Sequence, residues 1–202
     1  PDEAAGLAMK LDGLNAERQA IERDVLERAL AAAEAQAGRN CVVVAGEGWH
    51  PGVIGIVASR VVERFHRPAF VVALNDGIGK GSGRSVAGVD LGAAVTAARQ
   101  SDLLVNGGGH PMAAGLTVEE GKLEELSAFL DQRLADQVAS TPAVPELGVD
   151  GAVAVGAATD ELLHTVERIG PFGVGNAEPR FAVMGARVVH ADQVGENHVR
   201  CV

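Results

Sequence analysis

Two glycine-rich runs in the middle of the chain hold the residues best suited to bind an anion. They are Gly79-Lys80-Gly81-Ser82-Gly83-Arg84-Ser85 and Gly107-Gly108-Gly109-His110. Glycine-rich backbone can turn successive N–H groups toward one point, and a phosphate can approach it closely because no side chains intervene. Lys80, Arg84 and His110 add charge and directed donors. The runs therefore predict a phosphate site on two hairpin-like bends of the backbone; the alternative is two tight turns that only connect strands.

Neither run has the spacing of a known nucleotide-binding loop. A P-loop needs GxxxxGK[ST], and a dinucleotide-binding fold needs GxGxxG between a strand and a helix, and neither spacing occurs in the two runs. The chain also has no HExxH motif, no histidine pair at metal-ligand spacing and no GxSxG nucleophile elbow. The sequence signals alone therefore do not assemble a complete hydrolase active site.

Three residues upstream of the first run are weaker candidates. Trp49, the only tryptophan, could stack on a base, although such a residue more often fills a core. His50, like His110, precedes a proline, which is also typical of a histidine that caps a loop. Arg60 lies in a predicted helix and would ordinarily be a surface arginine.

The charge of the chain is unevenly distributed. Its 17 basic and 27 acidic side chains give a net charge of −10, which argues against a uniformly basic nucleic-acid binder. Residues 41–115, however, hold 6 basic and 5 acidic side chains, and these residues include both glycine-rich runs. A local anion site inside an acidic protein is therefore expected.

Two further features of the composition concern the setting of the protein. Cys41 and Cys201 lie far apart, with no CxxC motif, which argues against a disulfide scaffold and a structural zinc site and favours a reducing cytoplasm. The longest apolar runs are much shorter than the roughly 18 residues that a membrane span needs. The chain begins with Pro1 and shows no secretory leader, so we expect a cytoplasmic protein of which this chain is a fragment.

Periodicity and turn residues outline the elements that must position the two runs. The pattern over residues 1–140 predicts a long helix, then strand, helix, strand, strand, helix, strand and helix. The segments with the clearest signals are Leu7–Ala37, Asn40–Ala45, Pro51–His66, Ala69–Leu74, Leu91–Gln100, Leu116–Val118 and Glu119–Ala139. A helix of about 30 residues is longer than a small domain requires, so we interpret the first one as a connector.

The remainder of the chain predicts a second, mainly β domain. Ser140–Pro145 contains two prolines and no periodicity, which indicates a linker. Strand-like patterns follow at Val149–Val155, Phe181–His190 and His198–Val202, with a helix at Thr159–Ile169. The expected organisation is a connector helix (1–39), an α/β substrate-binding domain (40–140) and a partial β domain (141–202).

Three separated blocks resemble the DHH-associated domain of the RecJ family of single-stranded-DNA-specific exonucleases, in the family's order. The blocks are Gly48–Arg60, Lys80–Ser85 and Gly108–Gly115. Leu14–Gln19 is similar to the start of the family's helix between the two catalytic-core domains, and Gly170–Pro179 to the entry of its OB-type DNA-binding domain. The resemblance implies an α/β fold with a mixed-sheet DHH-associated domain, preceded by the connector helix and followed by the start of an OB-type domain.

The resemblance also implies an activity. Members are expected to act as 5′ to 3′ exonucleases on single-stranded DNA in repair and recombination, with two Mn²⁺ or Mg²⁺ ions held by a preceding DHH domain. No Asp-His-His tripeptide occurs here, so we expect this chain to bind no metal and to cleave nothing by itself. The expected partners are single-stranded DNA, the protein's own N-terminal DHH domain, a single-strand-binding protein and a helicase.

The family's motifs suggest roles for particular residues. By resemblance, Gly108, Gly109 and His110 contact the phosphate at the metal cleft, with His110 stabilising charge on the scissile phosphate. Arg84 forms a second anion contact with its neighbours, and Arg60 a third along the DNA path. The substrate-binding set implied in this way is Arg60, Lys80, Ser82, Arg84, Ser85, Gly108, Gly109 and His110. Ala177 stands where the family commonly has proline, which leaves only the rigidity of that loop in question.

Two other functions remain open at this point. One is a phosphodiesterase of the same superfamily that degrades short oligonucleotides or cyclic dinucleotides, but those enzymes resemble this chain only up to about Ala139. The other is a non-catalytic binding module, such as the related domain of alanyl-tRNA synthetases, which fits Trp49-His50-Pro51 less well.

Overall fold

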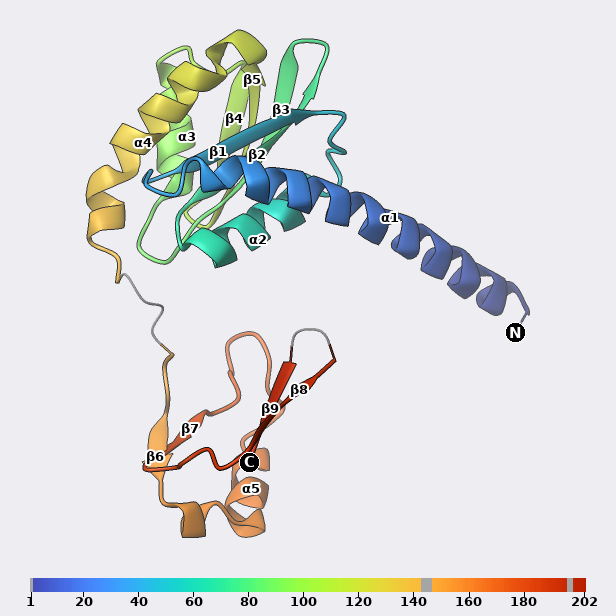
Figure 1. The fold of residues 1–202 in the computed structure, drawn as a ribbon, viewed down its shortest axis with the longest axis vertical. Coiled ribbons are helices and arrows are strands. Elements are labelled where there is room, and N and C mark those ends of the chain that lie inside the picture. Colours follow the sequence, from blue (N-terminus) through green and yellow to red (C-terminus); the bar gives the residue numbers. More distant parts are fainter. Residues whose placement is uncertain (1, 143–146, 196–197) are drawn as a thin grey trace. The chain divides into compact units, whose positions relative to one another are not determined.

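The computed structural model describes residues 2–142, 147–195 and 198–202, and residues 143–146 of the expected linker lie outside this range. The chain divides into two compact units, residues 1–145 and 146–202, which are described separately (Figure 1). Within residues 2–142, the first unit contains the α-helices α1 (Asp2–Glu34), α2 (Ile54–Phe65), α3 (Leu91–Gln100) and α4 (Leu123–Ala139). Its five strands are β1 (Val42–Glu47), β2 (Ala69–Asn75), β3 (Ile78–Arg84), β4 (Asn106–His110) and β5 (Ala113–Glu119), with a short 3₁₀ turn, η1 (Glu120–Lys122).

These strands form one mixed sheet in the order β1-β2-β3-β5-β4. β1 and β2 are parallel and are connected through α2, whereas all the other pairs are antiparallel. β2 and β3 are joined by a tight turn at Asp76 and Gly77, both with positive φ, which suits the Asn-Asp-Gly sequence at this point. β4, at the end of the order, is an edge strand.

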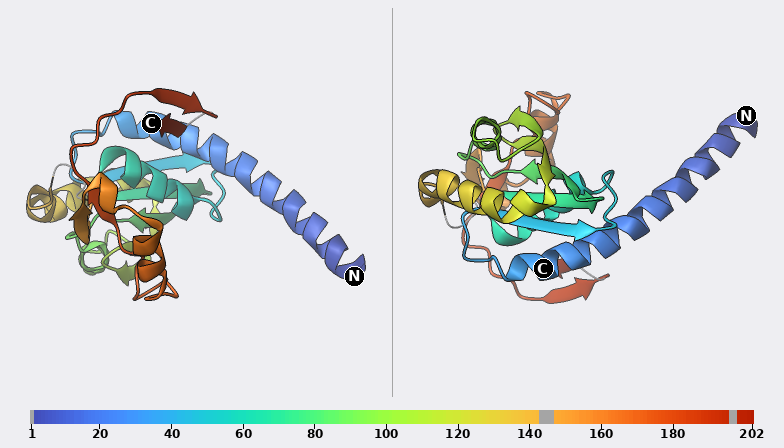
Figure 2. Two further views of the ribbon diagram at one scale, coloured as in Figure 1. Left: turned by 90° about the horizontal axis from the view of Figure 1, so that it is seen from below. Right: turned by 90° about the horizontal axis from the view of Figure 1, so that it is seen from above.

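Helices pack on both faces of the sheet, and each face has its own apolar core (Figures 1 and 2). α1 and α2 cover β1 and β2 on one face, where Val42, Val44 and Val71 are buried. α3 and α4 cover the other face, where Phe70, Val72 and Leu116 are buried. Successive residues of a strand point to opposite faces, so the near-continuous apolar runs of β1 and β2 follow from burial on both sides.

The two halves of α1 differ in their surroundings. Val25, Ala29 and Ala33 in the second half are buried against the sheet and α2. The apolar side chains of the first half are exposed, and this half extends beyond the rest of its unit (Figure 2). The periodicity predicted one continuous helix, and a continuous helix is observed, but only its second half belongs to a core.

Both glycine-rich runs lie in strands: the first forms the second strand of the predicted strand–strand pair, and neither is the hairpin-like bend expected for the phosphate site. Gly79–Arg84 falls within β3, and Gly107–His110 falls within β4, which was not expected as a strand at all. Pairing with β3 on one side and β4 on the other extends β5 to Ala113–Glu119, beyond the predicted Leu116–Val118. Strand propensity is low for glycine, so the tertiary pairing and not the local sequence fixes these two elements.

The second unit is mainly β. It contains strands β6 (Gly151–Val153), β7 (Phe181–Val183), β8 (Ala191–Val194) and β9 (His198–Cys201), helix α5 (Asp160–Glu167) and a 3₁₀ turn, η2 (Val155–Ala157). β6 pairs with β7 in parallel, and β8 pairs with β9 antiparallel. The predicted helix at Thr159–Ile169 corresponds to α5, with Thr159 capping its first turn through Leu162.

Candidate nucleic-acid interface

Successive residues of β3 lie on opposite faces of the sheet. Gly79, Gly81 and Gly83 face the core under α3 and α4, where the space is filled by side chains of neighbouring strands. A Cβ atom on Gly83 would lie 2.4 Å from Phe70 Cε1, and one on Gly81 would lie 2.6 Å from Leu116 Cδ1. Packing therefore requires glycine at these positions, while Lys80, Ser82 and Arg84 lie on the opposite face.

The strand register brings the second run beside the first on that opposite face. Arg84 and His110 both pair with Ala113, so they lie in one row, about 10 Å apart across two strand spacings. The next two rows are Ser82–Gly115–Gly108 and Lys80–Thr117–Asn106. We call this three-row patch of β3, β5 and β4 the open face, because most of its residues are exposed or half-buried.

The centre of the open face is bare backbone. Gly108 has no atom within 4 Å of the position that a Cβ would take, and Gly115 has only the Gly81 carbonyl oxygen at 3.9 Å. A shallow hollow of about 340 Å³ lies here, lined by residues 106–108 and 115–117. Packing does not require glycine at these two positions, in contrast to Gly81 and Gly83.

The amide groups of β3 cannot act as the predicted phosphate cradle. β3 lies between β2 and β5, and its backbone pairs with both neighbours along its whole length. N–H groups in such a ladder point alternately to the two neighbouring strands and not toward one anion. Side chains, rather than β3 amides, must therefore supply the donors on this part of the open face.

Arg84 is the best-placed donor of the open face. Its half-buried guanidinium is anchored through Nη1, which donates to Ser82 Oγ at 3.1 Å and to the Gly83 carbonyl at 2.9 Å. Within residues 2–142 it forms no ion pair with an acidic side chain, and Nε and Nη2 have no acceptor. An arginine held in this way presents one edge for two parallel hydrogen bonds to a phosphate.

The first turn of α2 lies next to this guanidinium. A Cβ built on Gly55 would lie 3.0 Å from Arg84 Nη2 and 3.2 Å from Ser82 Oγ. α2 has no side-chain cap and no acidic residue in its first turn, whereas α3 is capped by Asp90, which accepts from the Ala93 amide at 2.9 Å. The partial positive charge of an uncapped helix start and the guanidinium both favour an anion between them.

Several backbone contacts tie the ends of β3 and β4 together. The Ser85 amide donates to the Met112 carbonyl at 3.0 Å, and the Leu91 amide donates to the Pro111 carbonyl at 3.0 Å. Gly92 in α3 packs against the backbone of Gly109 and His110, since a Cβ there would lie 2.9 Å from the Gly109 carbonyl oxygen. The turn that carries His110 is therefore fixed to the strand that carries Arg84.

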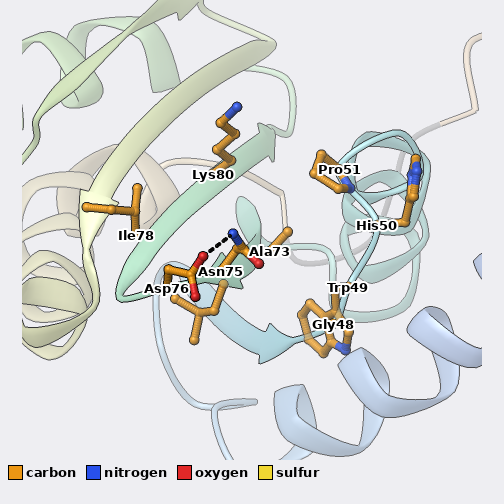
Figure 3. Close-up of a pocket in the computed structure, with 10 residues that line it drawn as sticks. Gly48, Trp49, His50, Pro51, Ala73, Asn75, Asp76, Ile78 and Lys80 are labelled. Atoms are coloured by element: carbon orange, nitrogen blue, oxygen red, sulfur yellow. Dashed lines mark hydrogen bonds between the residues drawn. The ribbon is translucent and has the colours of Figure 1, made fainter.

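A larger pocket of about 550 Å³ lies on the same face of the sheet, between the loop before α2 and the ends of β2 and β3 (Figure 3). Lys80 lines it from β3, opposite Pro51 and His50. Lys80 is exposed, and no ion pair involves it within residues 2–142. It can therefore contact a phosphate that lies near the mouth of this pocket.

Trp49 lines the same pocket but is a core residue. It is 5% exposed, it packs against Gly46, and the Arg28 guanidinium lies 5.7 Å from its ring centroid. Its ring is not free to stack on a base, in agreement with the core alternative. His50 is exposed, and its Nδ1 accepts from the Gly52 amide at 3.0 Å, so it caps the loop before α2.

Three residues of the predicted set lie apart from the open face: Gly109 pairs with buried Ala114 on the side that α3 and α4 cover, and Ser85 and Arg60 lie elsewhere. The Ser85 hydroxyl is buried and donates to the Val89 carbonyl at 2.8 Å, so it is committed to the loop after β3. Arg60 is five positions after Gly55, about 140° around α2, and lies on the α1 side of that helix. It pairs with Glu63 at 2.9 Å, and this hydrogen bond and the charges of Glu63 and Glu22 raise the pKa of Arg60.

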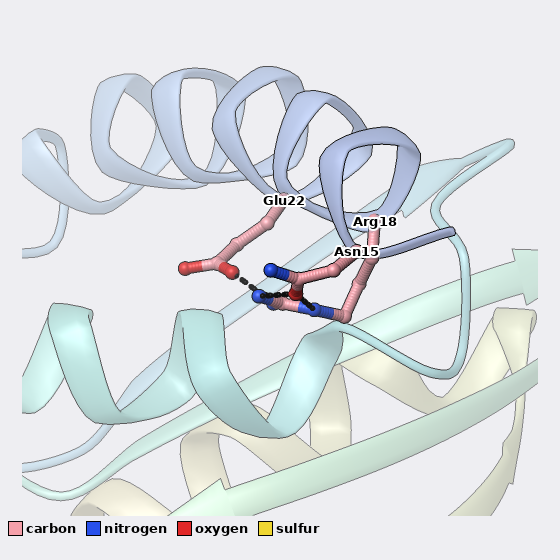
Figure 4. Close-up of polar contacts among 3 residues, drawn as sticks. All are labelled: Asn15, Arg18 and Glu22. Carbon is pink, nitrogen blue, oxygen red and sulfur yellow. Dashed lines mark hydrogen bonds and ion pairs between the residues drawn. The ribbon is translucent and has the colours of Figure 1, made fainter. Parts of the chain in front are cut away.

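The α1 residues next to α2 form a small network of their own (Figure 4). Arg18 donates to Asn15 Oδ1 from Nη2 at 3.0 Å and to Glu22 Oε2 from Nη1 at 2.5 Å. All three side chains belong to one helix at spacings of three and four, which lets them meet on one side. The network holds the Arg18 side chain in place on α1.

Comparison with known proteins agrees with this architecture. Residues 38–136 match the DHHA1 domain, and residues 149–202 match the RecJ OB domain. The single-stranded-DNA-specific exonuclease RecJ of Bacillus subtilis is 36% identical over 203 residues, which cover 98% of this chain and 26% of that protein. The chain belongs to the RecJ family. RecJ of Salmonella typhimurium is 34% identical, with 98% of this chain and 36% of that protein covered.

Solved RecJ structures have the same fold. The crystal structure of RecJ from Thermus thermophilus in complex with Mg²⁺ matches with a TM-score of 0.74 and 34% identity, over 96% of this chain and 30% of that one. The complex with Mn²⁺ matches with a TM-score of 0.75 at the same identity, over 96% and 28%. The predicted α/β architecture of long helix, mixed-sheet DHHA1 domain and RecJ OB domain is thus confirmed, for a chain that spans about a third or less of these RecJ proteins.

The described residues contain neither a metal-binding cluster nor a membrane-spanning helix. Among residues 2–142, 147–195 and 198–202, no three histidine, cysteine, aspartate or glutamate side chains gather in a way that could hold a metal ion. The three rows of the open face contain no carboxylate, and Lys80 and Arg84 are cationic there, which disfavours a divalent cation on this patch. Over the same residues, no helix combines the length and apolarity that crossing a membrane would need.

Proposed function

We propose that the open face binds the sugar–phosphate backbone of single-stranded DNA for an exonuclease reaction. The observation that carries this proposal is the Arg84 guanidinium, anchored on one side by Ser82 and Gly83 and without an acidic partner within residues 2–142. The RecJ relatives of this chain are named single-stranded-DNA-specific exonucleases, which supports single-stranded DNA as the anion that Arg84 binds. The RecJ OB match of residues 149–202 favours this function over the smaller phosphodiesterases of the superfamily.

The residues of the open face would divide the binding between them. Arg84 fits the forked geometry of one phosphate, and Lys80 adds a second cation four residues earlier on β3. His110 donates from its imidazole at the other end of the first row, and the bare backbone of Gly108 and Gly115 leaves room for the strand between them. Phosphate contacts carry no base information, so binding should be independent of sequence and should weaken with salt.

In the exonuclease reaction, His110 is the proposed catalytic residue of this chain. A donor held beside the scissile phosphate stabilises the charge that develops there. RecJ structures with Mg²⁺ or Mn²⁺ support the use of a divalent ion in the intact protein, where the DHH domain expected from the resemblance would hold it. We extend the same proposal to the setting of the reaction. The intact protein would digest DNA with 5′ to 3′ polarity, would act in repair and recombination in the cytoplasm, and would associate with a single-strand-binding protein and a helicase.

The test is DNA binding by single-charge variants of the 202-residue chain. Fluorescence anisotropy with a 3′-labelled, 5′-phosphorylated single-stranded oligonucleotide would compare the parent with Arg84→Ala and Arg133→Ala. Arg133 is exposed on α4, which covers the opposite face of the sheet, so the control removes an equal charge elsewhere. We expect Arg84→Ala to weaken binding by about tenfold or more and Arg133→Ala by less than about twofold. Equal losses in the two variants would rule out the open face as the binding site.

A further inference from the structure

Gly55 is a glycine in the first turn of a helix, where local preference does not favour it. Glycine is the least favourable residue of a helix interior apart from proline, and alanine is the most favourable. The φ angle of Gly55 is not in the left-handed region, so its backbone does not require glycine. The reason must lie in what surrounds its Cα atom.

The atoms nearest to Gly55 belong to the proposed phosphate-binding side chains. A Cβ would lie 3.0 Å from Arg84 Nη2, 3.2 Å from Ser82 Oγ and 3.7 Å from Arg84 Cζ. The corresponding neighbours of Gly92 in α3 are the backbone atoms of Gly109 and His110, which cannot move without shifting β4. At Gly55, by contrast, the nearest atom is at the end of the flexible Arg84 side chain, which can move away from an added methyl group without shifting the backbone.

We propose that Gly55 is a positioning residue, which keeps free the space that the Arg84 guanidinium occupies beside the first turn of α2. An added methyl group displaces Nη2 and Ser82 Oγ by a few tenths of an ångström without preventing folding. The displaced fork then meets a phosphate in poorer geometry, and two parallel charged hydrogen bonds depend steeply on that geometry. This inference rests on the proposed function, since it concerns the same phosphate.

The first measurement compares Gly55→Ala with Gly13→Ala in the 202-residue chain. Gly13 is also a helical glycine, exposed in the first half of α1 with no atom within 4 Å of a Cβ position. We expect both variants to keep or raise the thermal midpoint, because alanine is the better helix former. We expect Gly55→Ala alone to bind the 5′-phosphorylated oligonucleotide about fivefold more weakly. Parent-like affinity of a folded Gly55→Ala variant would overturn the inference.

The second measurement shows whether Gly55 acts through Arg84. Arg84→Lys keeps the charge but removes Nη2, so the contact with a residue-55 methyl group is lost. If Gly55 positions this guanidinium, Gly55→Ala should cost less than about twofold in the Arg84→Lys background. If Gly55→Ala lowers the DNA affinity about fivefold in both backgrounds, the effect comes from the helix itself and the inference is contradicted. An Arg84→Ala variant that binds like the parent would instead remove the proposed function, so the two failures are distinguishable.

Discussion

On the face of the sheet that α3 and α4 cover, the glycines of β3 have no room for a side chain, whereas on the open face the glycines of β4 and β5 have ample room. Gly81 and Gly83 would place a Cβ within 2.6 Å of a core side chain. Gly108 and Gly115 would place one in open space or at ordinary contact distance. Glycine in neighbouring strands therefore meets a packing requirement on one face and leaves the backbone accessible on the other.

The largest effect that the comparison predicts is on stability at Gly83. Gly83→Ala would place its methyl group 2.4 Å from Phe70 Cε1 and 2.8 Å from Leu91 Cδ2, so the core must expand. We expect the free energy of unfolding in urea to fall by about 3 kcal/mol. Gly108→Ala, the matched change on the open face, should alter it by about 0.5 kcal/mol or less. Similar losses at both positions would abolish the distinction between the two faces.

The next effect is on turnover and concerns His110. In the intact protein, His110→Ala should lower the rate of single-stranded DNA hydrolysis by about tenfold or more, because a charge-stabilising donor is lost. The side chain is exposed at the end of β4, so the far-UV circular dichroism spectrum should not change. Unaltered steady-state kinetics with a normal spectrum would take His110 out of the site.

We expect the stability of the protein to depend on pH through Cys41, which is buried in the core under α3 and α4. Burial, together with the nearby Asp131 carboxylate, raises the pKa of the Cys41 thiol well above its ordinary value of 9.0. Above about pH 9 the unfolded chain therefore loses this proton while the folded chain keeps it, so the free energy of unfolding falls as pH rises. The expected slope is about 1.4 kcal/mol per pH unit. Cys41→Ala should lack this contribution in urea titrations between about pH 9 and 10.5; an identical slope in the variant would refute it.

A smaller effect is expected for Lys80 on the open face. As a single exposed phosphate contact, it should contribute a few-fold in DNA affinity and about 0.7 to the slope of log affinity against log salt. Anisotropy titrations between about 50 and 200 mM salt would compare Lys80→Ala with Lys10→Ala, which removes a lysine from the first half of α1. The assignment fails if the two variants show the same slope.

The smallest effect is expected for Arg60. Its ion pair with Glu63 is largely exposed, and such pairs contribute little to stability. Arg60→Ala should weaken DNA binding by less than about twofold, since the residue lies on the α1 side of α2. A loss comparable to that of Arg84→Ala would extend the DNA path across α2, as the family resemblance alone suggested.

The sequence predicted the helices and the apolar strands because their signals are local. The periodicity of Val53, Val57 and Val61 is enough to place α2, and Asp90 marks the start of α3. β4 could not be predicted in this way, because Gly107–Gly109 has no strand propensity and is held by pairing with β5. Lys80, Ser82 and Arg84 alternate with glycine, and a period of two indicates a strand. The low strand propensity of glycine weakens this signal.

The candidate site could be predicted in its residue types but not in its arrangement. The sequence singled out Arg84 and His110, but their common row depends on the register of both strands with β5. The sequence does not single out Gly55, because its contact with Arg84 joins two residues far apart in the sequence. The distance of Arg60 from the open face could not be predicted either, because it depends on which side of α2 faces the sheet.

The backbone ties between the turn after β4 and the end of β3 have a consequence for recognition. Because the backbone amides of Ser85 and Leu91 hold that turn from two sides, the backbone positions of Arg84 and His110 are fixed relative to each other without any ligand. Such a preorganised pair loses little conformational freedom when it meets its ligand, so more of the attraction remains as affinity. In the proposed DNA site, this fixed separation would favour ligands whose anionic groups recur at a matching interval.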